Sequence, residues 1–239
     1  MADWFLATEG VKIVRDSASV WPQIITAVSS AGAALGGVGL THFFTRQREK
    51  AAAEDSLTRE RLFIATELVF ILERYAEGCA RVATDDGEEQ PPYGELEPTV
   101  MYPELDLTDV SGDWRVLPGM LMYRIRELPV LQNEARRTIS GVREYDHPPF
   151  FSDYFHERQY QYARLGMKAL LLAMRMRRAV GLPETRLADT EWSAHPVLWK
   201  VWRQERRHRA KLFLDKQKEF AEREAQDALR AVQPETASE

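Results

Sequence analysis

Cysteine is nearly absent from this chain, and so are the short motifs that mark two large enzyme classes. Cys79 is the only cysteine, so no intramolecular disulfide can form. This favours a reducing compartment as the location of the protein. The sequence holds no Gly-x-Ser-x-Gly elbow and no Gly-x-x-x-x-Gly-Lys-Ser/Thr phosphate loop. Cys79 falls on an apolar helical stripe, which favours a core position over a nucleophile. We expect no cofactor, and the balance leans against an enzyme.

The chain also lacks a strong net charge, an internal repeat and a run of alternating strand residues. Its formal net charge is −5, which argues against general nucleic-acid binding. Residues 46–239 are enough for one domain, and a hydrophobic content of 44% supports a folded core. Helical periodicity dominates, so the predicted fold class is all-α.

One segment lacks charge completely. Residues 17–45 contain no Asp, Glu, Lys or Arg, although these make up 29% of the chain. A helix needs about 20 apolar residues to cross a bilayer core of roughly 30 Å, and residues 21–44 are long enough. Trp21 at one end and Phe44 at the other suit the two interfaces. A buried helix in a soluble core is the alternative, but the four glycines of this run are better tolerated in a membrane.

The flanks of this run predict its orientation. Acidic residues outnumber basic ones before residue 17, so a cleaved signal peptide is a poor fit and a signal anchor a better one. Arg46, Arg48 and Lys50 follow the run and should stay in the cytoplasm. We expect an extracytoplasmic N-terminus (1–16), a transmembrane helix (17–45), a cytoplasmic domain (46–232) and a disordered tail (233–239). The layout resembles that of many bacterial inner-membrane proteins, and this similarity of architecture transfers no activity.

The membrane run carries a pattern for self-association. Gly32 and Gly36 form a Gly-x-x-x-Gly pair, which lets helices approach closely. The alternative is a simple anchor with permissive glycines. The simple anchor is slightly favoured, and a homo-oligomer held by this glycine pair is the close second interpretation.

The cytoplasmic domain is predicted as an antiparallel bundle of three to four helices. The first continues from the membrane run to about Arg81, and a coiled coil is possible there. The second begins near Leu117, is kinked at Pro129 and ends around 141–145. The third is capped by Ser152 or Asp153 and ends at Gly181. The fourth runs from near Pro196 to about Val232.

An acidic segment separates the first two helices of the bundle. Residues 84–113 contain ten Asp or Glu, four prolines and no Lys or Arg. The prolines prevent a regular helix. A site for a divalent cation or a basic protein partner is one interpretation. A solvated acidic loop is the favoured one, because no calcium-loop spacing is present.

One neighbourhood offers metal-ligating residues. Asp153 and His156 are about one turn apart and share a helix face, so they are the candidate metal ligands. Asp146, His147 and Glu157 lie nearby in the sequence. The spacing matches no established zinc or di-iron motif. The favoured interpretation is therefore that Asp153 lies in the first turn of a helix, while His156 is at the surface or is satisfied by a neighbour.

A basic cluster near the C-terminus offers a contact for anionic partners or lipid. Its members follow Trp199 and Trp202 and are Arg203, Arg206, Arg207, Arg209 and Lys211. Basic residues next to a membrane attract anionic lipid. The cluster alternatively pairs with the acidic segment 84–113 or is simply solvated.

These patterns rank three functions. The leading hypothesis is a membrane-tethered helical interaction or regulatory module that self-associates through its transmembrane helix. The second is an oligomeric membrane effector that permeabilises the bilayer. The third is a metal-dependent enzyme that uses Asp153 and His156.

Overall fold

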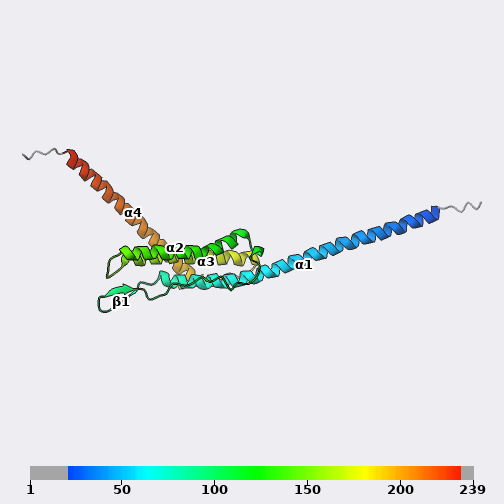
Figure 1. The fold of residues 1–239 in the computed structure, drawn as a ribbon, viewed down its shortest axis with the longest axis horizontal. Helices are drawn as coiled ribbons and strands as arrows, with labels where there is room; N and C mark the ends of the chain where they lie inside the picture. Colours follow the sequence, from blue (N-terminus) through cyan, green and yellow to red (C-terminus); the bar gives the residue numbers. More distant parts are fainter. Residues whose placement is uncertain (1–20, 233–239) are drawn as a thin grey trace, which may run out of the picture. The chain divides into compact units, whose positions relative to one another are not determined.

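The computed structural model describes the backbone of residues 21–232 and the side chains of residues 42–228. The chain divides into two units, Met1–Ser56 and Leu57–Glu239. The described part is mostly helical, so the prediction of an all-α fold is confirmed (Figure 1). Its helices are α1 (Trp21–Ala83), α2 (Gly119–Tyr145), α3 (Ser152–Val180) and α4 (Ala194–Val232). A 3-10 turn (Trp114–Val116) precedes α2.

The core of the second unit lies between α1, α2, α3 and the beginning of α4. Apolar residues recur every three or four positions on α1 from Ile64, and this stripe is fully buried as far as Ala83. It packs with stripes of α2 and α3 into one hydrophobic cluster, which Leu198 of α4 joins. Cys79 is fully buried in this cluster, as its sequence position predicts. Burial raises the pKa of the Cys79 thiol, so the thiol stays protonated at neutral pH.

One glycine lets three helices meet. A Cβ atom added to Gly166 of α3 would lie 2.8 Å from Cys79 Cβ of α1 and 2.8 Å from Leu198 Cδ2 of α4. Such separations are shorter than van der Waals contact, so a side chain at this position would push the helices apart. Gly166 therefore fixes where α4 attaches to the bundle.

The helix ends follow the sequence with two differences. α2 contains Pro129 and begins at Gly119 with Pro118 as its N-cap residue, whereas the sequence predicted a start near Leu117. α3 begins at Ser152, but Phe151 is the N-cap residue and makes no side-chain cap. The prediction that Ser152 or Asp153 caps α3 is therefore wrong. Asp146 caps the N-terminus of α3 instead, because its Oδ2 accepts a hydrogen bond from the Tyr154 N–H at 2.8 Å. Gly181 ends α3 in the left-handed region, as predicted.

The acidic segment is more regular than the sequence indicated. It forms a small antiparallel hairpin of β1 (Glu88–Gln90) and β2 (Glu95–Glu97), whereas no strand was predicted. Alternation is hard to detect in strands of three residues, and the register sets Glu88 opposite Glu97. Like charges in that arrangement are unfavourable. Arg143 of α2 offsets this by pairing with Glu97 at 2.5 Å.

An ion pair inside the bundle holds the base of this hairpin. Arg158 of α3 and Asp85 are both buried, and the Arg158 Nη1 lies 2.8 Å from Asp85 Oδ2. Asp85 also accepts hydrogen bonds from the Thr99 hydroxyl and from the backbone N–H groups of Gly87, Thr99 and Val100. Burial raises the pKa of Asp85, but these donors and Arg158 outweigh it and lower the pKa to about 2. We call this pair the buried latch.

The predicted transmembrane helix falls mainly on residues whose side chains are not described. Residues 17–20 lie outside the described chain, and residues 21–41 have a described backbone only, which is helical. Within the part that the structure describes, no helix has both the length and the hydropathy needed to cross a membrane. Gly32 and Gly36 lie in the backbone-only part of α1, so the self-association pattern is outside the described side chains.

Candidate functional site: the outer face of α4

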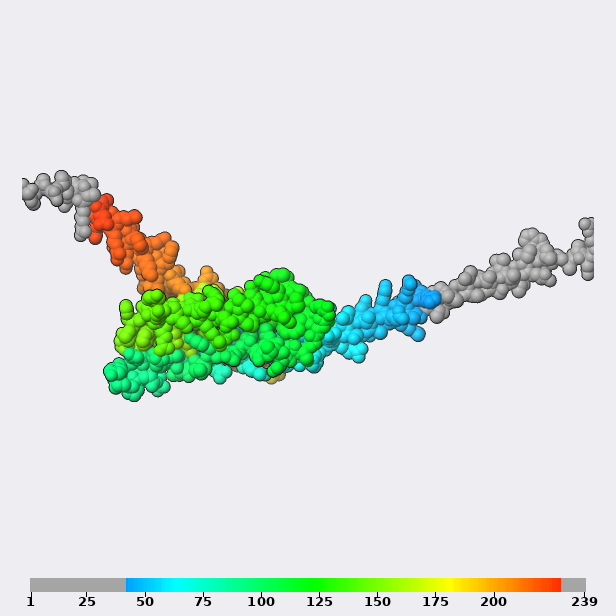
Figure 2. All heavy atoms as spheres, viewed as in Figure 1, coloured from blue at the N-terminus to red at the C-terminus, as the bar shows by residue number. Residues whose placement is uncertain are grey.

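The predicted basic cluster lies on α4, a helix with two different sides. The side toward the bundle carries Leu198, which is fully buried, and Glu205, which is 1% exposed. The other side carries Trp199, Arg203 and Arg206, which are all exposed. Residues 210–228 are exposed apart from Asp215, which is half-buried. In Figure 2 this second half of α4, in orange and red, presents its side chains openly.

His156 and Glu205 join α3 to α4. Each carboxylate oxygen of Glu205 lies 3.1 Å from His156 Nδ1. In the tautomer that carries its proton on Nδ1, the ring donates this hydrogen bond to the carboxylate. The His156 ring also stacks on the His208 ring, with centroids 4.1 Å apart. His156 is thus satisfied by a neighbour across the helix interface.

Glu157 and Arg209 form the next contact between the same helices. The Arg209 guanidinium pairs with Glu157, whose other oxygen accepts a 2.6 Å hydrogen bond from Gln161 Nε2. The same guanidinium lies 3.9 Å from the centroid of the Tyr160 ring. Arg209 therefore holds α4 against α3, and its charge is matched within the bundle.

The remaining basic residues are arranged with the two tryptophans. The Trp199 and Trp202 rings stack with centroids 5.1 Å apart. The Arg206 guanidinium lies 4.8 Å from the Trp202 ring, and that of Arg203 lies 6.0 Å from the Trp199 ring. Both are within or near the range of cation–π attraction. The result is a row of alternating indole rings and guanidinium groups, which is exposed at Trp199, Arg203 and Arg206 and half-buried at Trp202.

This row continues into the exposed half of α4. Trp199, Arg206, Phe213 and Phe220 are seven residues apart, which places them on one side of a helix. Trp199, Phe213 and Phe220 are 44%, 62% and 68% exposed. We call the row from Trp199 to Phe220 the outer face. The basic cluster and the two tryptophans in its first half were predicted from the sequence, whereas Phe213 and Phe220 were not, although their seven-residue spacing was the available signal.

The acidic segment does not neutralise this face. Among the described residues, the ion pairs of segment 84–113 are formed with Arg143, Arg158 and Arg115. No ion pair in the described part of the chain involves Arg203, Arg206, Arg207 or Lys211. The alternative in which the basic cluster pairs with the acidic segment therefore has no contact to support it.

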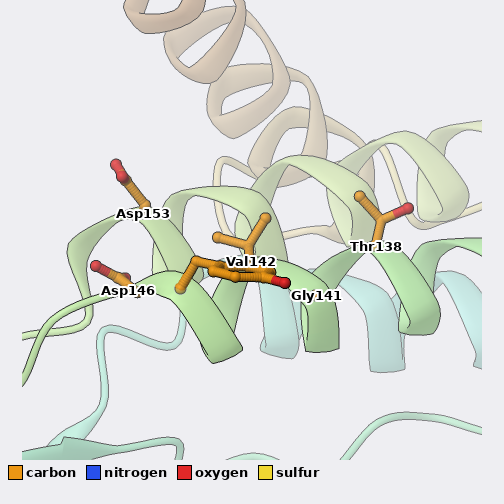
Figure 3. Close-up of a pocket in the computed structure, with 6 residues that line it drawn as sticks. Thr138, Gly141, Val142, Asp146 and Asp153 are labelled. Atoms are coloured by element: carbon orange, nitrogen blue, oxygen red, sulfur yellow. The ribbon is translucent and has the colours of Figure 1, made fainter.

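The residues around the candidate metal ligands are mostly engaged elsewhere. Asp146 accepts hydrogen bonds from the backbone N–H groups of His147 and Tyr154, and it lines a surface hollow with Asp153 and Thr138. Figure 3 shows the two Asp side chains at one end of that hollow and Thr138 at the other. His156 contacts Glu205 instead. In the described part of the chain, no group of three or more His, Cys, Asp or Glu side chains is placed to hold a metal.

Comparison with protein-family models, with curated proteins and with solved structures gives no match to this chain.

Proposed function

We propose that this protein is a membrane-tethered helical module that binds a partner rather than transforming a substrate. The observation that carries the proposal is the uncharged run of residues 17–45, which Arg46, Arg48 and Lys50 follow directly. Its length suits a bilayer, and its basic flank suits the cytoplasmic side of an inner membrane. The bundle would then lie in the cytoplasm and the short N-terminus outside.

The continuity of α1 supports this arrangement. α1 is helical from Trp21 to Ala83, so no loop interrupts the chain between the proposed membrane span and the buried stripe that starts at Ile64. An unbroken helix of n residues extends about 1.5 Å per residue. A span and a core on one helix give the bundle a direct covalent link to the bilayer.

Alkaline carbonate extraction of cell membranes tests the tether. The full chain is compared with a version that starts at Arg46, which keeps the buried part of α1. We expect the full chain to stay in the membrane pellet and the shorter version to be released. Release of the full chain would contradict the tether. Retention of both versions would show that the bundle itself binds membranes.

Self-association through the span is the second part of the proposal. Gly32 and Gly36 would let two spans pack closely, because small residues four apart form a shallow groove on a helix. Crosslinking in membranes should give dimers or larger species for the natural chain and fewer for Gly32→Leu/Gly36→Leu. Ala34→Leu, on another side of the same helix, is the matched control. Monomers alone from the natural chain would remove this part of the proposal.

A further inference from the structure

The outer face of α4 has no covering element among the described residues, and its chemistry specifies a partner. Three large aromatic side chains on it, Trp199, Phe213 and Phe220, are exposed to solvent at 44% or more. Isolated exposed apolar residues are ordinary, but a row of aromatic residues along one helix side marks a binding surface. The question is which partner suits both the rings and the charges around them.

The charges around the row are strongly one-sided. Residues 203–218 contain seven Lys or Arg and two acidic residues. One of the acidic residues, Glu205, is buried against His156, and one of the basic residues, Arg209, is paired with Glu157. Five more basic residues than acidic ones therefore surround the aromatic row, and this count includes the two that are paired. A partner for this face needs negative charge.

The order of residues on α4 separates apolar from basic and from acidic positions. Helical spacing places Ala210, Phe213 and Phe220 near the centre of the outer face, with Arg203 and Lys216 at its flanks. Glu219 and Glu222 fall on the opposite side. A helix with aromatic residues on one face and Lys or Arg beside them is typical of helices that lie in the membrane interface.

A second copy of the same face is a poor partner. Two outer faces brought together would join two surfaces that each carry more basic than acidic residues, and these repel in either orientation of the helices. A bilayer with anionic lipid satisfies both requirements at once. Indole and phenyl rings enter the boundary between headgroups and acyl chains, while Arg and Lys reach the phosphates.

We infer that the outer face of α4, from Trp199 to Phe220, lies on the surface of a membrane that contains anionic lipid. This inference rests on the proposed function, since it names the partner of the tethered module. The first half of α4 is fixed to α3 by Leu198, Glu205 and Arg209. Contact of the second half with lipid would therefore orient the whole bundle against the bilayer.

A fluorescent reporter on α4 tests the contact directly in the full chain. The environment-sensitive dye NBD is attached at Phe220→Cys or at Glu219→Cys, each in a Cys79→Ala background, and the protein is mixed or reconstituted with vesicles. Vesicles contain phosphatidylcholine alone or with phosphatidylglycerol. We expect a blue shift and quenching by nitroxide-labelled lipid at residue 220, only with phosphatidylglycerol and with little change at residue 219. Equal signals at both positions, or none at either, would overturn the inference.

Charge removal supplies a second, independent measurement. Arg203→Gln/Arg206→Gln/Arg207→Gln should weaken the affinity for anionic vesicles, measured by the dye response, about 100-fold. Each basic residue near anionic lipid contributes about a factor of five to this affinity. The control Arg74→Gln/Arg178→Gln/Arg186→Gln changes the net charge equally at exposed positions outside α4. It should leave the response unchanged. An equal loss in both variants would mean that net charge, and not this face, decides binding.

These outcomes separate the inference from the tether. If the full chain resists carbonate but residue 220 gives no anionic-lipid response, the tether stands and the α4 contact is wrong. If the full chain is released by carbonate but the dye at residue 220 still responds to anionic lipid, the α4 contact stands and the tether is wrong. A response at residue 220 to a second protein copy, with dimers but no vesicle effect, would assign the face to self-association and overturn the lipid contact.

Discussion

The interior of the bundle and the outer face of α4 each place an arginine over an aromatic ring, with different surroundings. Arg158 lies 5.3 Å from the Tyr102 ring and is fully buried, and Asp85 matches its charge. Arg206 lies 4.8 Å from the Trp202 ring, is exposed, and makes no ion pair within the described residues. A buried charge without a partner is costly, whereas an exposed one is solvated. The same kind of contact, an arginine over an aromatic ring, is therefore part of the folded core in one place and lies at the solvent-exposed surface in the other.

The largest loss of stability should come from a substitution in the buried latch. Asp85→Ala removes the partner of Arg158 and the acceptor of several backbone N–H groups, so we expect a loss of about 4 kcal/mol in the free energy of unfolding. Urea unfolding followed by circular dichroism measures it. Glu134→Ala removes a carboxylate from an exposed pair with Arg137 and should cost about 0.5 kcal/mol or less. If Asp85→Ala does not fold, Asp85→Asn provides the measurement. Equal small losses in the two positions would contradict the role of the latch.

The pH dependence of stability should report the same latch with a smaller effect. The pKa of Asp85 is about 2 in the folded state against an ordinary 3.8, so its stabilisation is complete above about pH 4 and is lost as the pH falls toward 2. The folded-state pKa of Asp85 is nearly two pH units below its ordinary value, which corresponds to about 2 kcal/mol in the free energy of unfolding. Unfolding at several pH values should show this loss in the natural chain and a smaller one in Asp85→Asn. Identical pH profiles for the two proteins would refute it.

The attachment of α4 can be weakened without changing any charge. Gly166→Ala places a methyl group 2.8 Å from Cys79 Cβ and from Leu198, so we expect a destabilisation of about 1–2 kcal/mol by overpacking. Gly141→Ala is the matched control within α2, because a Cβ atom there meets nothing within 4 Å. This control should stabilise the helix by about 0.5–1 kcal/mol. Thermal unfolding of the two variants should therefore move in opposite directions.

The smallest effect on stability should come from the outer face itself. Arg203→Gln/Arg206→Gln removes two exposed guanidinium groups that stack on Trp199 and Trp202, and we expect a loss below about 1 kcal/mol. The same variant should lose most of its response to anionic vesicles. Urea unfolding and vesicle titration of one preparation check both statements. A loss as large as that of Asp85→Ala would mean that this face belongs to the folded core.

The sequence predicts the helices well and the contacts between distant residues poorly. The stripe on α1 and the end of α3 at Gly181 depend on local spacing and on one residue type, and both were predicted. The Asp85–Arg158 pair joins residues 73 positions apart, and no local pattern indicates it. The hairpin was missed because its strands have three residues each.

In the candidate site, too, the basic residues were predicted from the sequence but their contacts across helices were not. Arg203, Arg206, Arg207, Arg209 and Lys211 were identified as one basic cluster from their closeness in the sequence. Arg209 belongs to the same run in the sequence, yet its guanidinium pairs with Glu157 across the helix interface. His156 was weighed as a metal ligand, and its partner Glu205 lies 49 residues away. Helix periodicity shows which residues share a side, but only the packing of α3 against α4 shows which side is covered.

The membrane tether is the central claim, and a positional series of charges tests it most directly. Arginine at the centre of a transmembrane helix costs about 2.5–3.5 kcal/mol, whereas near the end it reaches the interface at little cost. We would compare Ala33→Arg/Ala34→Arg with Phe43→Arg/Phe44→Arg in the full chain by carbonate extraction. The tether predicts that the central pair releases the protein from membranes while the terminal pair leaves it in the pellet. Equal behaviour of the two variants would contradict a bilayer-spanning helix at residues 17–45.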